Sequence, residues 1–159
     1  HIVLQIAKHM YPNSKVFVFT KRRGDAPGEL AEGMGADWVG ATGDRPPRKY
    51  DRAIDTTPLG DVVRIALEHL EEGGRLVINN IRKETPIPGM DYADHLWGER
   101  EIKSVKNVSR RDIREFLPLA AEIPIVPEIT EFGLEEANRA LLALKRGEYR
   151  GAGVLRIAD

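Results

Sequence analysis

The fold of this chain is decided by residues 50–78, which read YDRAIDTTPLGDVVRIALEHLEEGGRLVI. The first part of this stretch predicts a strand, and Thr57 is predicted to cap a helix whose first residue is Pro58. That helix carries apolar residues at i, i+3, i+4 and i+7 until Gly73-Gly74 stops it, and a second strand follows. Two strands separated by a helix predict parallel pairing, because a parallel connection must cross over a face of the sheet.

The same alternation of helices and strands continues on both sides of this stretch. The expected helices cover residues 2–10 and 28–34, a segment capped by Ser109, and residues 134–146, and the expected strands cover 15–20, 36–39, 101–106, 125–129 and 153–157. Pro118 lies inside the helix after Ser109 and should kink it or end it early. The elements together predict an α/β fold, a doubly wound, Rossmann-like, mainly parallel sheet with helices on both faces.

The composition limits the classes of function. The 159 residues are 42% hydrophobic and 31% charged, and the net charge of −1 gives no overall attraction to nucleic acid or to an acidic membrane. The sequence has no cysteine, so it contains no disulfide and no thiolate metal ligand. No apolar run approaches the roughly 18 residues of a membrane span. We therefore expect a cytoplasmic protein without nucleic-acid or membrane partners, in which any anion site is a local cluster of cations.

Polar residues follow four of the expected strands. They are Thr20-Lys21-Arg22-Arg23, Thr56-Thr57, Asn79-Asn80 and Lys106-Asn107-Val108. Doubly wound sheets bind their ligands at the carboxyl ends of the strands. We therefore expect these four groups to offer hydrogen-bonding atoms along one rim of the sheet.

Five segments taken together resemble the cofactor-binding half of zinc-type medium-chain alcohol dehydrogenases. In order they are LAEGMGADWV (30–39), YDRAIDTTP (50–58), LEEGGRLVINNI (70–81), HLWGEREIKSVKNVSRRD (95–112) and ITEFGLEEANRALLALKRGEYRGAGVLRI (129–157). The resemblance spans nearly the whole chain, and the order and spacing are more specific than any single segment. It implies a nucleotide-binding domain over residues 1–123 and a C-terminal strand-helix-strand over residues 124–159 that returns toward the catalytic domain.

The resemblance also implies that the first strand and the glycine-rich turn of the family are missing from this chain. No G-x-G-x-x-G motif is present. The absent strand would lie between the strands at Lys15 and Asp51 and would leave unpaired backbone groups on both. The family's zinc is expected only in the absent catalytic half, and we therefore expect the 159-residue chain alone to be inactive.

Three consecutive cations, residues 21–23, follow the strand whose end contacts the adenosine ribose in the family. An acidic side chain at the end of that strand binds the ribose 2′-hydroxyl, whereas a basic one accommodates a 2′-phosphate. The acidic position is occupied here by Thr20, so the neutral and cationic donors favour NADP over NAD. Two alternatives stay open: the cations form only a solvated rim, or Asp25 or Glu29 reaches the ribose.

The resemblance assigns roles to the other strand ends as well. It places Thr56 and Thr57 on the adenosine side of the cofactor, although a helix cap explains Thr57 equally well. It places Asn79 and Asn80 beside the nicotinamide. The backbone of residues 106–108 is expected to face the nicotinamide carboxamide, with a plain strand-to-helix turn as the alternative.

Two further groups of side chains are candidates for ligand binding. The spacing of Asp91, Asp94, His95 and Glu99 suggests metal ligands on a helical turn, but without a cysteine or a second histidine nearby we expect a solvated loop. Arg150 is a candidate for the cofactor pyrophosphate, because Ala152 occupies the position where family members often have an arginine.

The resemblance implies hydride transfer between a small alcohol or aldehyde and a nicotinamide dinucleotide, in a full-length enzyme that is a homo-oligomer. Two alternatives remain. One is a zinc-independent quinone or enoyl reductase of the same superfamily. The other is a noncatalytic dimerisation module, because the strand at residues 101–106 is expected at a sheet edge, where an uncovered strand invites pairing with a second copy.

Overall fold

The computed structural model describes residues 1–158 and shows two compact units. The continuous unit is Thr42–Glu115, and the split unit combines His1–Ala41 with the chain from Phe116 onward. The boundary between the units falls inside helix α4 (Arg110–Glu122).

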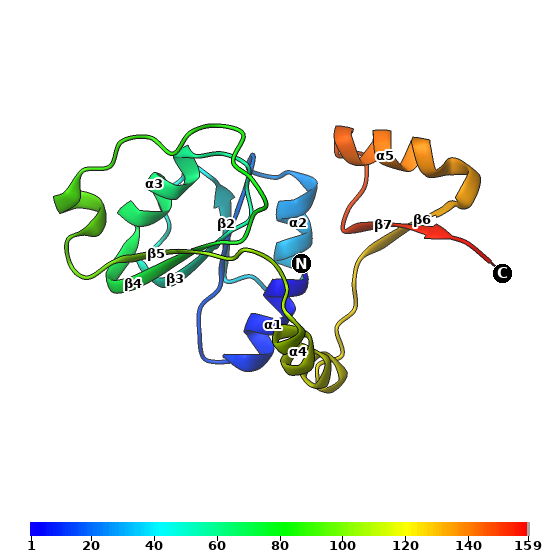
Figure 1. Ribbon diagram of the computed structural model, residues 1–159, viewed down its shortest axis with the longest axis horizontal. Helices are drawn as coiled ribbons and strands as arrows, with labels where there is room; N and C mark the ends of the chain where they lie inside the picture. Colours follow the sequence, from blue (N-terminus) through cyan, green and yellow to red (C-terminus); the bar gives the residue numbers. More distant parts are fainter. Residues whose placement is uncertain (159) are drawn as a thin grey trace. The chain divides into compact units, whose positions relative to one another are not determined.

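The continuous unit is a three-stranded parallel sheet with a helix packed on it (Figure 1). Its elements are β3 (Tyr50–Asp55), α3 (Asp61–Glu68), β4 (Leu70–Ile78), the π-helical turn η1 (Tyr92–Leu96) and β5 (Glu101–Ser104). The strand order is β3-β4-β5, so β5 is an edge strand. The parallel strand-helix-strand unit predicted from residues 50–78 is confirmed.

The core of the continuous unit lies between α3 and the sheet. Tyr50 contributes its ring to this core, and its hydroxyl donates to the carbonyl of Ala66 at 3.1 Å. Burial raises the pKa of Tyr50 to about 12. The apolar spacing read from the sequence therefore does bury one face of the helix. Four side chains in this core are fully buried: Val63, Leu67, Leu70 and Leu76.

The helix after β3 differs from its prediction at both ends. Thr57 does not cap it, because the hydroxyl and the backbone N–H of Thr57 both bind Asp55, and α3 begins only after Gly60. Gly73-Gly74 does not end the helix but lies within β4, where the pairing with β3 is irregular. The φ of +68° at Gly73 suits such an irregularity, since glycine adopts positive φ without steric cost.

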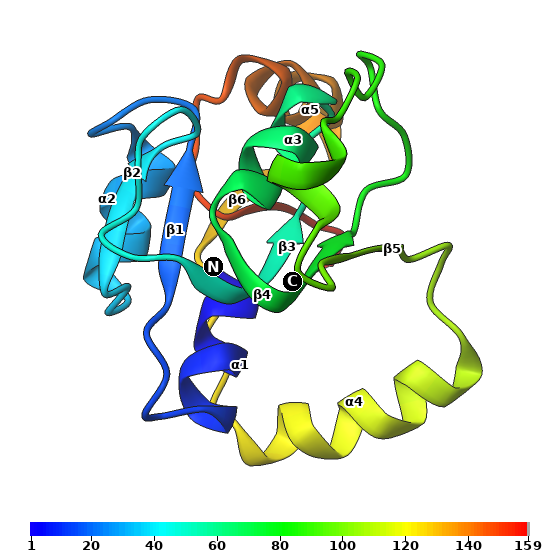
Figure 2. The same cartoon turned by 90° about the vertical axis from the view of Figure 1, so that its left-hand side faces the viewer.

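The split unit contains two separate two-stranded parallel sheets. Figure 2 shows α2 beside the first of them. In the second, the ring of Phe132 meets that of Tyr149 edge-on at 5.6 Å and packs with Ala140 and Ala143. The elements of the split unit are α1 (Ile2–Met10), β1 (Phe17–Thr20), α2 (Ala26–Gly33), β2 (Trp38–Ala41), β6 (Ile129–Gly133), η2 (Leu134–Glu136), α5 (Ala137–Arg146) and β7 (Ala152–Arg156).

The strand orders agree with those of a doubly wound fold. In the common order 3-2-1-4-5-6, the β1–β2 pair corresponds to strands 2 and 3, and β3-β4-β5 corresponds to strands 4, 5 and 6. Within residues 1–158, no backbone pairing joins these two sheets. The α/β class and the parallel pairing are confirmed.

Pro118 lies inside α4, which does not end there but continues to Glu122, so only the early end among the two expected effects is excluded. The carbonyl of Arg114, which loses its helical partner at Pro118, belongs to an exposed residue, so water can satisfy it. The strand expected over residues 125–129 begins only at Ile129. None of the helices in residues 1–158 is both long enough and apolar enough to cross a membrane.

Asp37 joins α1, β1 and β2 of the split unit. Its carboxylate accepts hydrogen bonds from the Lys8 Nζ at 2.6 Å, the Lys15 Nζ at 2.9 Å and the backbone N–H of Val16 at 2.9 Å. These bonds, with that from Lys8 first, hold the pKa of Asp37 well below its usual range. A carboxyl whose pKa is lowered by folding stabilises the folded state above its unfolded pKa and loses that effect as the pH falls toward the folded pKa.

Replacing Asp37 by asparagine is therefore expected to remove part of the pH dependence of stability below about pH 4. The Asp37→Asn protein should be less stable than wild type at neutral pH, and the difference should shrink as the pH is lowered from about 4 to about 2. Urea unfolding of both proteins across this pH range measures the stability difference. The control is Asp51→Asn, because the side chain of Asp51 is exposed. A difference between Asp37→Asn and wild type that stays constant down to pH ~2 would contradict the assignment.

Candidate functional site

The carboxyl ends of β3, β4 and β5 lie side by side at one edge of the sheet in the continuous unit. Asp55 is paired with Ile78, and Ile78 with Ser104. The backbone N–H of Asn79 donates to the Asp55 carbonyl at 2.8 Å, and that of Val105 donates to the Ile78 carbonyl at 3.1 Å. The chain therefore leaves the three strands in register.

This register brings three of the four predicted site groups together within the continuous unit. They are Thr56-Thr57 after β3, Asn79-Asn80 after β4 and Lys106-Asn107-Val108 after β5. The fourth group, residues 20–23, follows β1 and belongs to the split unit.

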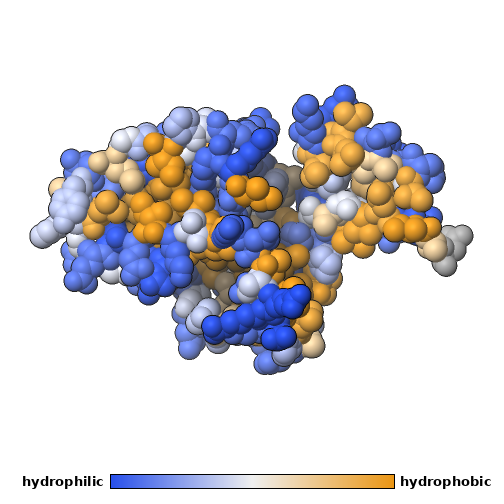
Figure 3. Space-filling model, viewed as in Figure 1, coloured by the Kyte–Doolittle hydropathy of each residue, from blue (hydrophilic) through white to orange (hydrophobic). Residues whose placement is uncertain are grey.

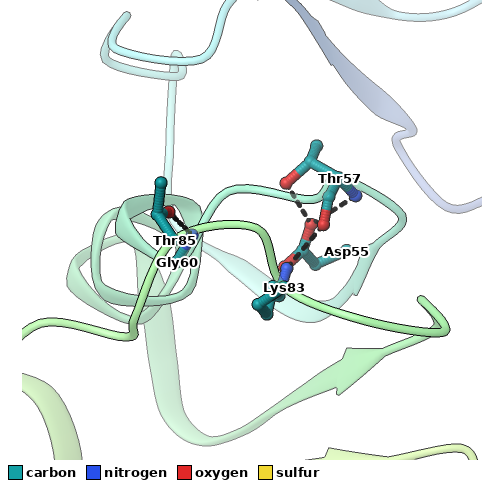
Figure 4. Close-up of polar contacts among 5 residues, drawn as sticks. All are labelled: Asp55, Thr57, Gly60, Lys83 and Thr85. Carbon is teal, nitrogen blue, oxygen red and sulfur yellow. Dashed lines mark hydrogen bonds and ion pairs between the residues drawn. The ribbon is translucent and has the colours of Figure 1, made fainter.

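Asp55 is a buried acidic residue at the end of β3 (Figure 4). Its side chain is 1% exposed, and its Oδ2 accepts from the Lys83 Nζ at 2.5 Å. Its Oδ1 accepts from the backbone N–H and from the hydroxyl of Thr57, both at 2.8 Å. Because the hydroxyl hydrogen of Thr57 is used in this way, the hydroxyl can act toward a ligand only as an acceptor.

The Lys83–Pro86 segment binds across the turn between β3 and α3 (Figure 4). Lys83 donates to the Thr57 carbonyl at 2.7 Å, and the backbone N–H of Gly60 donates to the Thr85 hydroxyl at 2.7 Å. The Pro86 carbonyl approaches Gly60 so closely that an added Cβ would lie 2.0 Å from its oxygen. The loop after β4 is thus held against the end of β3 by charge, hydrogen bonds and close packing.

Asn79 and Asn80 follow the apolar end of β4. Asn79 is exposed, whereas the side-chain oxygen of Asn80 is buried and has no hydrogen-bond partner among residues 1–158. A buried acceptor without a donor costs free energy, and such groups are rare in folded proteins. The Asn80 oxygen therefore fits a ligand that supplies an N–H or O–H at this edge of the sheet.

Residues 106–108 form an exposed turn between β5 and α4. The backbone N–H of Val108 donates to the Asn107 side chain at 2.8 Å. The cap expected at Ser109 is confirmed, since its hydroxyl accepts from the Asp112 N–H at 3.2 Å and its own N–H donates to the Asp112 carboxylate at 2.6 Å. Helix capping therefore explains the hydrogen bonds of Ser109 at the C-terminal end of this turn.

In the split unit, Thr20 ends β1 and begins a tight turn into α2. Its hydroxyl donates to the Arg22 carbonyl at 3.0 Å. Asp25 caps α2 by accepting from the backbone N–H of Gly28 at 3.0 Å and of Arg22 at 3.1 Å. Burial raises the pKa of Asp25, but the hydrogen bonds from Arg22 and Gly28 outweigh it, and the pKa is lowered. The side chains of residues 21–23 are exposed.

Glu29 and Arg150 form an ion pair at 2.6 Å in the split unit. Both acidic residues that could have replaced the cations at the ribose are therefore engaged, Asp25 as a helix cap and Glu29 with Arg150. Beside them lies a pocket of about 340 Å³, lined by Thr20, Tyr149, Arg150 and apolar side chains of α1, β1 and α2. The ion pair is exposed, so it is a weak constraint that a ligand can displace.

Within residues 1–158, no group of three or more His, Cys, Asp or Glu residues is placed to hold a metal ion. His95 nevertheless differs from the solvated loop expected for its segment, because it is buried on η1. Its Nδ1 lies 2.8 Å from the Asp91 carbonyl oxygen, and its Nε2 lies 3.5 Å from the Glu68 carboxylate on α3. His95 is therefore buried beside α3, and the expectation is wrong for this residue.

Sequence reasoning missed Asp55, Lys83 and Thr85. Asp55 carried a signal, since a charged residue at the end of an apolar strand needs a partner when it is buried. Lys83 and Thr85 carried none, because they lie in an irregular, proline-containing loop without periodicity. The Lys83–Asp55 bond joins residues 28 positions apart, which only the folded structure reveals.

Comparison with known proteins agrees with this fold. No protein-family model matches the chain. The protein described as "Probable alcohol dehydrogenase AdhA" of Mycobacterium tuberculosis is 40% identical over 157 residues, which are 99% of this chain and 44% of that protein. The chain thus spans less than half the length of this curated relative.

Solved structures show the same fold. The alcohol dehydrogenase of Aeropyrum pernix has a TM-score of 0.78 at 24% identity, covering 99% of this chain and 46% of its own. The acetophenone reductase of Geotrichum candidum, solved in complex with NAD, has a TM-score of 0.76 at 21% identity. The match covers 96% of this chain and 43% of the reductase chain. Over nearly its whole length the chain is therefore similar to part of a protein described as a probable alcohol dehydrogenase, and it shares the fold of solved alcohol dehydrogenases.

Proposed function

We propose that this chain is the nicotinamide-dinucleotide-binding part of a zinc-dependent alcohol dehydrogenase, which transfers a hydride between a small alcohol or aldehyde and NAD(P). The observation that carries the proposal is the alignment of three parallel strand ends at one edge of the sheet, together with the buried side-chain oxygen of Asn80, which follows the middle strand and has no hydrogen-bond partner among residues 1–158. The 40% identity to an alcohol dehydrogenase and the NAD complex of the acetophenone reductase support it.

In this proposal each strand end of the continuous unit binds its own part of the cofactor. Asn79 and Asn80 contact the nicotinamide, and the backbone of residues 106–108 faces its carboxamide. Thr56 and Thr57 contact the adenosine side. When bound, the nicotinamide ring supplies the carbon that gives or takes the hydride. The protein's contribution is to hold that ring in one orientation, which lowers the entropic part of the barrier.

The turn after β1 in the split unit is proposed to bind the adenosine ribose and to favour NADP. Thr20 offers no carboxylate that would repel a 2′-phosphate, and residues 21–23 supply three exposed cations. The two nearby acidic residues support this choice, because Asp25 and Glu29 are engaged with the α2 backbone and with Arg150. Arginine and lysine together provide bidentate and point-charge contacts to a phosphate.

The described residues do not fit a zinc ion, and we assign no zinc-dependent step to this chain. In the proposed enzyme, zinc and its ligands would belong to the part of the family that this chain does not span. The proposal therefore assigns no dehydrogenase activity to the 159-residue chain alone.

Residues 124–159 are proposed to contact the remainder of the full-length protein. Figure 3 shows apolar side chains gathered over α5 and β7. A concentration of exposed apolar side chains on a small strand-helix-strand is typical of a surface that packs against another part of a protein. The large apolar residues of 124–158 that are more than a third exposed are Val126, Ile129, Leu134, Leu141, Leu142, Leu144, Val154, Leu155 and Ile157.

The full-length protein is also proposed to form a homo-oligomer through β5. This strand is the edge of the β3-β4-β5 sheet, and all of its residues are exposed. An uncovered edge strand offers unpaired backbone groups to a second copy. Ile102 and Val105 add exposed apolar side chains at the same edge.

Neutralising residues 21–23 is expected to remove the preference for NADP. In the full-length protein, Lys21→Gln, Arg22→Gln and Arg23→Gln together should weaken NADPH binding by about 10- to 100-fold, because charge-assisted hydrogen bonds to the 2′-phosphate are lost. NADH binding should change by less than about threefold. Paired fluorescence titrations with NADPH and NADH measure both effects.

A matched control replaces three exposed cations far from the strand ends in sequence, Arg139, Lys145 and Arg146 on α5, by glutamine. This variant should bind both nucleotides as wild type does. Tighter binding of NADH than of NADPH by the wild-type protein would contradict the role of residues 21–23.

A further inference from the structure

Lys83 and Asp55 form an ion pair that is withdrawn from water. The Lys83 side chain is 14% exposed and that of Asp55 is 1% exposed, with 2.5 Å between the Nζ and the Oδ2. Burying two charges costs solvation free energy that their attraction often fails to recover, and an apolar pair of similar size is frequently as stable. This pair is therefore poorly explained as a source of stability alone.

The position of the pair suggests what else it does. Lys83 lies four residues beyond Asn79, and Asp55 ends β3 directly before Thr56 and Thr57. A single ammonium group thus connects the loop after β4 to the turn after β3, through Asp55 Oδ2 and the Thr57 carbonyl. The loop and the turn carry four of the residues proposed to contact the cofactor.

Two neighbouring contacts support the same connection. The backbone N–H of Glu84 donates to the Pro58 carbonyl at 2.7 Å, and the Thr85 hydroxyl accepts from Gly60 at 2.7 Å. The Asn79–Lys83 loop is therefore anchored at its start by the β3–β4 pairing and at its end by the Lys83–Pro86 segment. Without the Lys83 contact, only the first anchor and these weaker uncharged bonds would restrain it.

We propose that Lys83 is a positioning residue that, through its ion pair with Asp55, fixes Thr57 and the Asn79–Asn80 pair in the arrangement that binds the nicotinamide dinucleotide. This inference rests on the proposed function. If the loop adopts the binding arrangement only part of the time, the apparent dissociation constant rises in inverse proportion to that fraction. Loss of Lys83 should therefore weaken nucleotide binding without removing any contact between the protein and the nucleotide.

The test compares three variants of the full-length protein by NADPH fluorescence titration and by thermal unfolding. Lys83→Met leaves the buried Asp55 carboxylate unpaired and should lower both affinity and Tm. Asp55→Asn with Lys83→Met removes both charges and should return Tm to within a few degrees of wild type. Arg82→Met is the matched control, because Arg82 is the neighbouring cation with an 80% exposed side chain.

The double variant decides between a positioning role and a purely structural one. We expect its NADPH dissociation constant to stay about tenfold above that of wild type while its Tm recovers, and Arg82→Met to match wild type in both. Recovery of affinity together with Tm would overturn the inference and leave the proposed function intact. A wild-type protein that binds neither NADPH nor NADH would overturn the proposed function itself.

Discussion

Replacing Leu67 by alanine is expected to lower the free energy of unfolding by about 2–5 kcal/mol. Leu67 on α3 is fully buried, at 0% exposure, among Val63, Leu70 and Leu76. Truncation removes apolar contacts and leaves a cavity that the surrounding structure closes only in part. Urea unfolding followed by far-UV circular dichroism measures the loss.

The matched control is Leu59→Ala, which removes the same atoms from a side chain that is 47% exposed just before α3. It should cost less than about 1 kcal/mol. Equal losses of stability for the two substitutions would contradict the position of the core between α3 and β4.

Replacing Gly60 by alanine is expected to cost about 1–3 kcal/mol or more, although the backbone itself would tolerate the change. Gly60 has φ −68° and ψ −36°, where alanine is normally the more stable residue. The Lys83–Pro86 segment makes the change in stability unfavourable, because the new Cβ would lie 2.0 Å from the Pro86 oxygen and 2.8 Å from the Ile87 nitrogen. The segment must move for the side chain to fit.

Gly89→Ala in the same loop is the control, since nothing lies within 4 Å of a Cβ at that position. It should leave Tm within a few degrees of wild type, whereas Gly60→Ala should lower Tm and weaken NADPH binding together. An unchanged or raised Tm for Gly60→Ala would mean that the Lys83–Pro86 segment does not pack on the β3–α3 turn.

The sequence predicted those features of the fold that depend on local periodicity. The strand Tyr50–Asp55, the amphipathic α3 and the parallel pairing of β3 with β4 follow from apolar spacing and from connection length. The predicted start of the helix was wrong because Thr57 can form hydrogen bonds with more than one partner. Its hydroxyl and N–H bind the Asp55 carboxylate in place of a helix end, and no local pattern decides between the two.

The candidate site was predictable only in part, for a similar reason. Polar residues after apolar strands identified the strand ends, and the parallel register brings three of those groups to one edge. The residues that organise this edge, Lys83 and Thr85, act across the loop after β4. Their contacts depend on where an irregular loop returns to the sheet, which neither propensity nor periodicity specifies.

Equilibrium binding of NADPH to the full-length protein, followed by the fluorescence of its nicotinamide ring, tests the central claim most directly. The strand-end residues are expected to give saturable binding, with an enhanced emission as the ring leaves water, and with NADH binding more weakly. An emission that stays at the value for free NADPH, with no saturation by either nucleotide at millimolar concentration, would contradict the assignment of these strand ends to a nicotinamide dinucleotide.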